Sequence, residues 1–125
     1  MADDRLVELA KQGTRAWNAW RAAHPDSPVD LSGAGLRALD LTGADLAGAD
    51  LAGADLRGAS LARAGLAGAT LRGANLFKAM LDGADLAGAD LRGVQFLHCA
   101  QLQAACAWES AYRDEELACG AAVPN

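Results

Sequence analysis

The chain has no Ile, only four Val, and few aromatic residues, which make up 5% of the sequence. A typical globular core mixes branched and aromatic side chains to fill irregular space. Here 31 Ala and 19 Leu supply most of the hydrophobic content. One small and one large residue can fill a core only if it is regular. The 125 residues are enough for a single domain spanning 1–125, and too few for a large cleft between two lobes.

The sequence also lacks a long apolar run and a basic patch. No stretch of about 18 apolar residues is present, so a membrane-spanning helix is not expected. The acidic start and missing apolar leader favour a cytoplasmic location. The net charge is −5, with residues 29–98 carrying eight Asp against five Arg and one Lys. Direct binding to nucleic acid is therefore not expected.

Three cysteines, Cys99, Cys106 and Cys119, lie in the last quarter of the chain. In a cytoplasmic protein an odd number of cysteines favours free, buried thiols. A Cys106–Cys119 disulfide and a metal site with His98 are the alternatives. The spacing matches no zinc pattern, and no cofactor is expected.

The strongest feature is a five-residue repeat. Leu recurs at every fifth position from residue 31 to residue 91, and Phe96 follows in the same phase, which gives fourteen units. Ala usually stands two residues before each of these centres, Asp often one before, and Gly often two after.

A period of five fits neither an α-helix nor a β-strand. We therefore expect each unit to be one straight side of a coil. The central Leu and the Ala two residues earlier would point inward, while the Asp between them points outward and bonds local backbone. The Gly would occupy the corner, where unusual dihedral angles are needed.

The tandem Ala-Asp/Asn-Leu pattern of residues 29–98 resembles the pentapeptide repeat family. The resemblance implies an all-β solenoid: a right-handed quadrilateral parallel β-helix, here of about 3.5 coils, with four units per coil. Residues twenty apart would then form columns. On the second face the column after the centres is Arg37, Arg57, Phe77 and Leu97, and on the fourth face it is Ala47, Ala67 and Ala87.

The two ends of the chain differ in character from the repeat. Residues 4–23 have apolar residues at helical spacing, which predicts a capping helix, with Asp3 or Asp4 at its start and residues 24–28 as a linker. Residues 99–125 are expected to form a C-terminal helical cap and tail. Trp108 and Tyr112 would belong to that cap, or alternatively to a homodimer contact.

The sequence offers no catalytic constellation, because His24 and His98 lie at opposite ends of the repeat without a predicted nucleophile. We expect a non-catalytic scaffold or interaction module with a protein partner. The second-face and fourth-face columns, together with Trp108 and Tyr112, are the candidate interaction residues, and one of the two faces could make a homotypic contact. The alternative, implied by the family's fluoroquinolone-resistance members, is a DNA-mimic inhibitor or protector of a type II topoisomerase. The short solenoid and its five Arg make it a poor duplex mimic.

Overall fold

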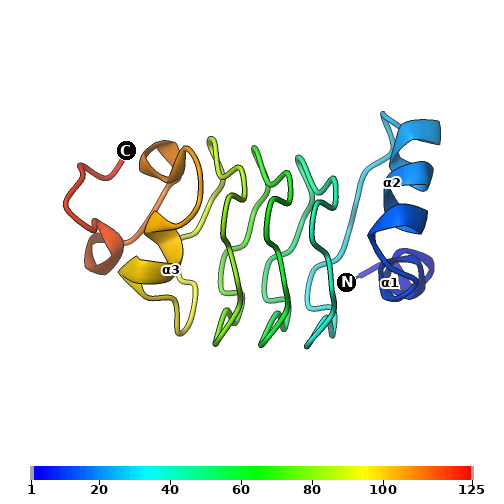
Figure 1. The fold of residues 1–125 in the computed structure, drawn as a ribbon, viewed down its shortest axis with the longest axis horizontal. Coiled ribbons are helices and arrows are strands. Elements are labelled where there is room, and N and C mark those ends of the chain that lie inside the picture. Colours follow the sequence, from blue (N-terminus) through cyan, green and yellow to red (C-terminus); the bar gives the residue numbers. More distant parts are fainter. Residues whose placement is uncertain (1, 125) are drawn as a thin grey trace.

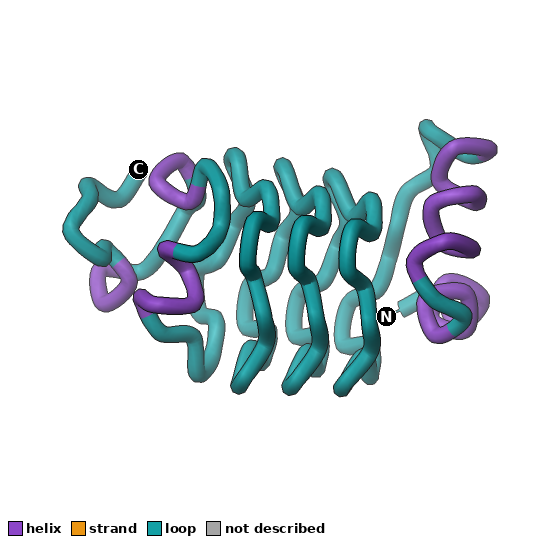
Figure 2. Tube along the Cα trace, in the orientation of Figure 1, coloured by secondary structure: helices purple, strands orange, loops and turns teal. Residues whose placement is uncertain are grey.

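The computed structural model describes residues 2–124, which form a solenoid with helices at both ends (Figure 1). Helices α1 (Asp4–Lys11) and α2 (Thr14–Ala23) precede the solenoid. Helix α3 (Cys99–Gln103) and two short 3-10 helices, η1 (Trp108–Ser110) and η2 (Glu115–Leu117), follow it. Between them the described chain contains single parallel bridges and turns rather than extended strands (Figure 2).

Successive coils are joined by parallel bridges between residues twenty apart, from Asp30–Asp50 to Asn75–Gln95. The backbone hydrogen bonds repeat with the same period. The Leu51 N–H donates to the Thr70 carbonyl at 2.8 Å, and the Thr70 N–H donates to the Ala49 carbonyl at 3.0 Å. Each turn of the solenoid therefore comprises four five-residue sides.

Leu and Ala side chains fill the interior of the solenoid. All thirteen Leu centres from Leu31 to Leu91 are at most 1% exposed, and the Ala two residues before a centre is at most 5% exposed. This confirms the predicted inward alternation. Each side ends in a turn at the residue two after the centre, and Gly58 there has a φ of 68°, a conformation that glycine adopts at little cost.

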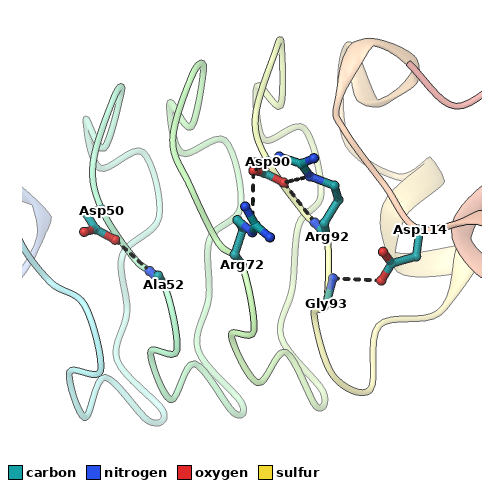
Figure 3. Close-up of polar contacts among 7 residues, drawn as sticks. All are labelled: Asp50, Ala52, Arg72, Asp90, Arg92, Gly93 and Asp114. Carbon is teal, nitrogen blue, oxygen red and sulfur yellow. Dashed lines mark hydrogen bonds and ion pairs between the residues drawn. The ribbon is translucent and has the colours of Figure 1, made fainter. Parts of the chain in front are cut away.

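The outward carboxylates hold the turns, as the sequence predicted. Asp50 Oδ1 accepts a hydrogen bond of 3.0 Å from the Ala52 N–H (Figure 3). Asp85 and Ala87 repeat this contact, and Asn75 makes it with an amide oxygen to the Phe77 N–H. An acceptor one residue before the centre thus stabilises the following corner.

The predicted single helix over residues 4–23 is wrong, because Gly13 divides it. Gly13 has a φ of 103°, outside the helical region, and α1 and α2 lie on either side of it. Asp3 caps α1 by accepting a 2.9 Å hydrogen bond from the Arg5 N–H. A glycine in a helical pattern was the available signal for this break.

Helix α2 lies against the first coil through polar side chains. Trp17 is fully buried, and its Nε1 donates to the Asp45 carbonyl at 2.7 Å. Asn18 accepts from the Asp45 N–H at 2.7 Å and donates to the Gly43 carbonyl at 3.1 Å. The two contacts with Asp45 satisfy backbone groups that a preceding coil would otherwise pair, which protects an open β edge.

The repeat phase slips by one residue at Phe96, contrary to the sequence prediction. Phe96 is 59% exposed with a φ of 61°, whereas Leu97 is 8% exposed and points into the core. Leu97, expected on the outer second face, is thus not a surface residue. Leu102, five residues after Leu97, is fully buried in the shifted phase.

The C-terminal segment continues the solenoid further than a helical cap would. Cys106 bridges to Asp85 and Tyr112 to Asp90, so the chain adds sides to the last coil. Tyr112 precedes Arg113 as Asp90 precedes Leu91, and Arg113 therefore follows Leu91 in the first-face column of centres. Only residues 99–103 of this segment form an α-helix.

Arg113 is 2% exposed, and its guanidinium organises the C-terminal turn. It donates hydrogen bonds of 2.8 to 3.1 Å to five backbone carbonyls, those of Glu109, Ala111, Leu117, Ala118 and Ala122. It also lies over the Trp108 ring, 5.2 Å from the ring centroid. Burial lowers the pKa of Arg113 from its ordinary value.

The expectation that all three thiols are free and buried is wrong. Cys99 and Cys119 form a disulfide, with their Cα atoms 5.6 Å apart. Cys106 is the free cysteine, and it is exposed. Sequence spacing alone cannot reveal which cysteines pair, because the pairing depends on how the chain turns between α3 and η2.

Candidate interaction surface

The solenoid presents four outer faces, each made of the sides that stack every twenty residues. The first face comprises residues 30–33, 50–53, 70–73 and 90–93. The second comprises 35–38, 55–58, 75–78 and 95–96. The third comprises 40–43, 60–63 and 80–83, and the fourth comprises 45–48, 65–68 and 85–88.

The first face holds a network of charged side chains (Figure 3). Arg92 donates to Asp90 at 2.8 and 2.9 Å, and Arg72 Nε lies 3.9 Å from the same carboxylate. These contacts, the Arg92 hydrogen bond foremost, lower the pKa of Asp90. At the C-terminal end of this face, Asp114 accepts a hydrogen bond of 2.7 Å from the Gly93 N–H.

The second face is aromatic and basic. Phe77 is 45% exposed and Phe96 is 59% exposed, and their rings meet edge to face with centroids 5.9 Å apart. The Lys78 ammonium lies 5.3 Å from the centroid of Phe77. The slip at residue 96 therefore replaces the predicted Leu97 with a second aromatic ring on this face.

Arg57 and Asp55 form an ion pair on the second face. Arg57 Nη2 and Nε donate to the two carboxylate oxygens at 2.7 and 2.8 Å. This hydrogen bonding lowers the pKa of Asp55 to about 2. Arg37 and Lys78 are the bases of this face without an ion pair in the described structure.

The fourth face is flat. Ala47, Ala67 and Ala87 follow the centres there, and Gly48, Gly68 and Gly88 occupy the corners. Arg21 donates to the Ala47 carbonyl at 2.8 Å and also lies 3.6 Å from Asp45.

Trp108 and Tyr112 are engaged by their own chain. Trp108 is partly buried against the core and lies under Arg113. Tyr112 is 37% exposed, and the Arg92 guanidinium lies 5.7 Å from its ring centroid. Both side chains complete the C-terminal turn of this molecule.

A cleft of about 770 Å³ lies between α1, α2 and the linker, with Leu9, Trp20, His24 and Pro28 among its lining residues. Its His24 stacks on Trp20, and the His24 Nδ1 donates a hydrogen bond of 3.0 Å to the Trp20 carbonyl. Over residues 2–124 no group of three or more His, Cys, Asp or Glu side chains could hold a metal ion, and no helix is long and apolar enough to cross a membrane.

These features define a repeat solenoid with side-chain variety only on its outside. The family model for pentapeptide repeats matches residues 40–76, 54–93 and 71–106, which together cover more than half of the chain. The chain therefore belongs to the pentapeptide repeat family, and its fold is a right-handed β-helix solenoid.

One solved structure with a TM-score above 0.5 agrees with this assignment. A pentapeptide repeat protein, Rfr23, from the cyanobacterium Cyanothece 51142 is 33% identical with a TM-score of 0.53. The match covers 70% of this chain and 54% of that one, so the chain spans about half the length of that relative. HetL of Nostoc sp. strain PCC 7120, a pentapeptide repeat protein involved in heterocyst differentiation regulation, is 33% identical over 69% of this chain and 39% of that chain, with a TM-score of 0.37.

QnrB1, a plasmid-mediated fluoroquinolone resistance protein, is 20% identical over 71% of this chain and 59% of that chain. Its TM-score of 0.23 is too low to support any argument about function. No curated protein matches significantly.

Proposed function

We propose that residues 1–125 form a single capped domain of about 3.5 square coils that acts as a non-catalytic protein-interaction module. The exposed Phe77–Phe96 pair is the observation that carries this proposal. Leu and Ala fill the interior, so recognition falls to the outer faces. Exposed aromatic residues and Arg are enriched in protein contact sites.

The partner surface is proposed to centre on Phe77 and to include Arg37 and Arg57. The fourth-face residues Ala47, Ala67 and Ala87 are a second contact area. Leu97 is left out because it is buried. Trp108 and Tyr112 contact their own chain at the end of the solenoid, and the alternative of a homodimer contact through them stays a prediction.

Site-specific photo-crosslinking in the native cell tests this function. Phe77 would be replaced by a photo-reactive phenylalanine derivative, and Ala62, the matching position on the third face, by the same residue as control. We expect protein adducts from position 77 and few from position 62. Equal labelling at both positions, or none at either, would contradict an interaction role for the second face.

The topoisomerase alternative stays a prediction. A duplex mimic presents negative charge, whereas the second face has three bases and one acid. A gyrase supercoiling assay at micromolar concentrations of the protein tests the alternative, and unchanged supercoiling would remove it.

The proposed compartment is the cytoplasm. Cytoplasmic thiols are kept reduced, so Cys99 and Cys119 would be reduced there outside brief oxidation. Trapping thiols in intact cells measures this, and a fully oxidised pair at steady state would argue for another compartment.

A further inference from the structure

We propose that the second face of one molecule docks on the fourth face of another copy of the same chain. This inference rests on the proposed interaction role of the second face and adds the partner and its orientation. The two faces lie on opposite sides of the four-sided coil, so the contact is head to tail.

The aromatic pair is the first reason. Phe96 has a φ of 61°, a left-handed conformation that bulky residues rarely adopt. That conformation turns Phe96 outward beside Phe77 and turns Leu97 inward. Strained residues persist where the surrounding structure enforces them, and they often mark functional positions. The two exposed rings in contact form an apolar projection, which would pack best against a flat apolar surface.

Charge is the second reason, and it favours the fourth face as the surface on which the second face docks. The second face carries Arg37, Arg57 and Lys78 against Asp55, whereas the fourth carries Asp45 and Asp85, and the base near it is Arg21 of α2, 3.6 Å from Asp45. The other two faces each have one more acid than base. A contact between two second faces, or between two fourth faces, would place like charges together. A second face against a fourth face pairs opposite charges.

Shape agrees with charge. Side chains after the fourth-face centres are methyl groups, and its corners are glycines. Arg21 reaches the Ala47 carbonyl at one end of this face, so the Phe77 and Phe96 rings would lie over its middle, around Ala67 and Gly68. Both faces are built on the same coil spacing of about 4.8 Å, so their rows share one repeat. A solenoid of about 17 Å offers roughly a few hundred Å² per face, well below the area of stable complexes. We therefore expect weak association at high protein concentration, reduced by salt.

Sedimentation equilibrium from micromolar to millimolar protein measures this association. All proteins carry Cys106→Ser, because the exposed Cys106 thiol could cross-link two copies. One variant, Phe77→Ala with Phe96→Asn, removes the aromatic pair and keeps a residue that tolerates a positive φ. The other, Ala67→Arg, places a long cation on the fourth face. Circular dichroism checks that both variants fold.

We expect the parent protein to associate and each variant alone to be a monomer. An equimolar mixture of the two variants should form a heterodimer and stop there, because each retains one intact face. A parent protein that stays monomeric throughout would overturn the proposal. So would self-association of Ala67→Arg, since that contact would not use the fourth face.

A charge variant separates the fourth face from the acidic C-terminal segment. Asp45→Asn with Asp85→Asn keeps the acceptors that hold the turns, as Asn75 does naturally. It should weaken association roughly tenfold and reduce its dependence on salt. The matched control, Glu115→Gln with Glu116→Gln, should change nothing, and the reverse pattern would contradict the proposal. If every protein is monomeric while photo-crosslinking at position 77 still yields other proteins, only the self-contact fails.

Discussion

Arg113→Leu is the most informative single substitution, because the repeat pattern and the structure predict opposite changes in stability. Arg113 follows Leu91 in the first-face column, where every other centre is Leu. The repeat pattern alone predicts that leucine at this position would stabilise the fold. In the structure the guanidinium instead satisfies five backbone carbonyls while 2% exposed.

The expected cost follows from these contacts. The carbonyls of Ala111 and Leu117 lie in buried hydrogen bonds, and leaving each unpaired costs about 1–3 kcal/mol. The other three carbonyls are partly buried, and each lost bond costs about 1 kcal/mol. Burying leucine returns about 1.5–3 kcal/mol. The net loss is about 2–7 kcal/mol, confined to the C-terminal turn.

Amide hydrogen exchange on the oxidised protein measures this loss locally. The Tyr112 N–H, bonded to the Ala89 carbonyl at 2.8 Å, should exchange faster in Arg113→Leu by about one and a half orders of magnitude or more. The Thr70 N–H in the middle of the solenoid serves as the internal control and should change little. Unchanged or slower exchange at Tyr112 would refute the reasoning.

Three further predictions concern the core, the charges and the disulfide. Leu61→Ala should lower the free energy of unfolding by about 2–5 kcal/mol in urea titrations, because Leu61 is fully buried in a lattice that cannot collapse; a loss under about 1 kcal/mol would contradict a rigid interior. The Asp55 carboxyl, with a pKa of about 2, should contribute stability above pH 3.8 that is lost as the pH falls towards 2; carboxyl NMR should show the midpoint rising in Arg57→Gln, and an unchanged midpoint would refute the ion-pair cause. Cys99→Ser should lower the melting temperature, since it opens a loop with a sequence separation of 20 and costs about 3 kcal/mol; the matched control Cys106→Ser should melt like the parent, and equal melting of all three proteins would argue against the disulfide.

The regular part of the fold was predictable from sequence because one local rule repeats. Leu61 and Ala59 point inward since they lie two residues apart on an extended side, and every coil meets the same neighbours. The turn acceptor at Asp50 followed from the same reasoning. The five-residue period alone was enough to predict the core, because the core contacts are all between equivalent positions of the repeat.

The irregular part depends on contacts that no period contains. Phe96 sat in phase with the Leu centres, yet its neighbour Leu97 takes the buried place. The spacing of five from Leu97 to Leu102 was the only sequence sign of this slip. Arg113 could not be predicted either, because its role depends on five carbonyls brought together by the C-terminal turn. The aromatic candidate surface was thus half predicted, through Phe77, and half missed, through Phe96.

The proposed surface depends on Phe96 being exposed and Leu97 being buried, and NMR tests these two positions directly. With centroids 5.9 Å apart, the Phe77 and Phe96 rings should show mutual nuclear Overhauser effects, and Leu97 methyl groups should show them to the buried Leu core. Phe96 ring contacts to core Leu methyl groups, with Leu97 exposed to solvent, would contradict the account.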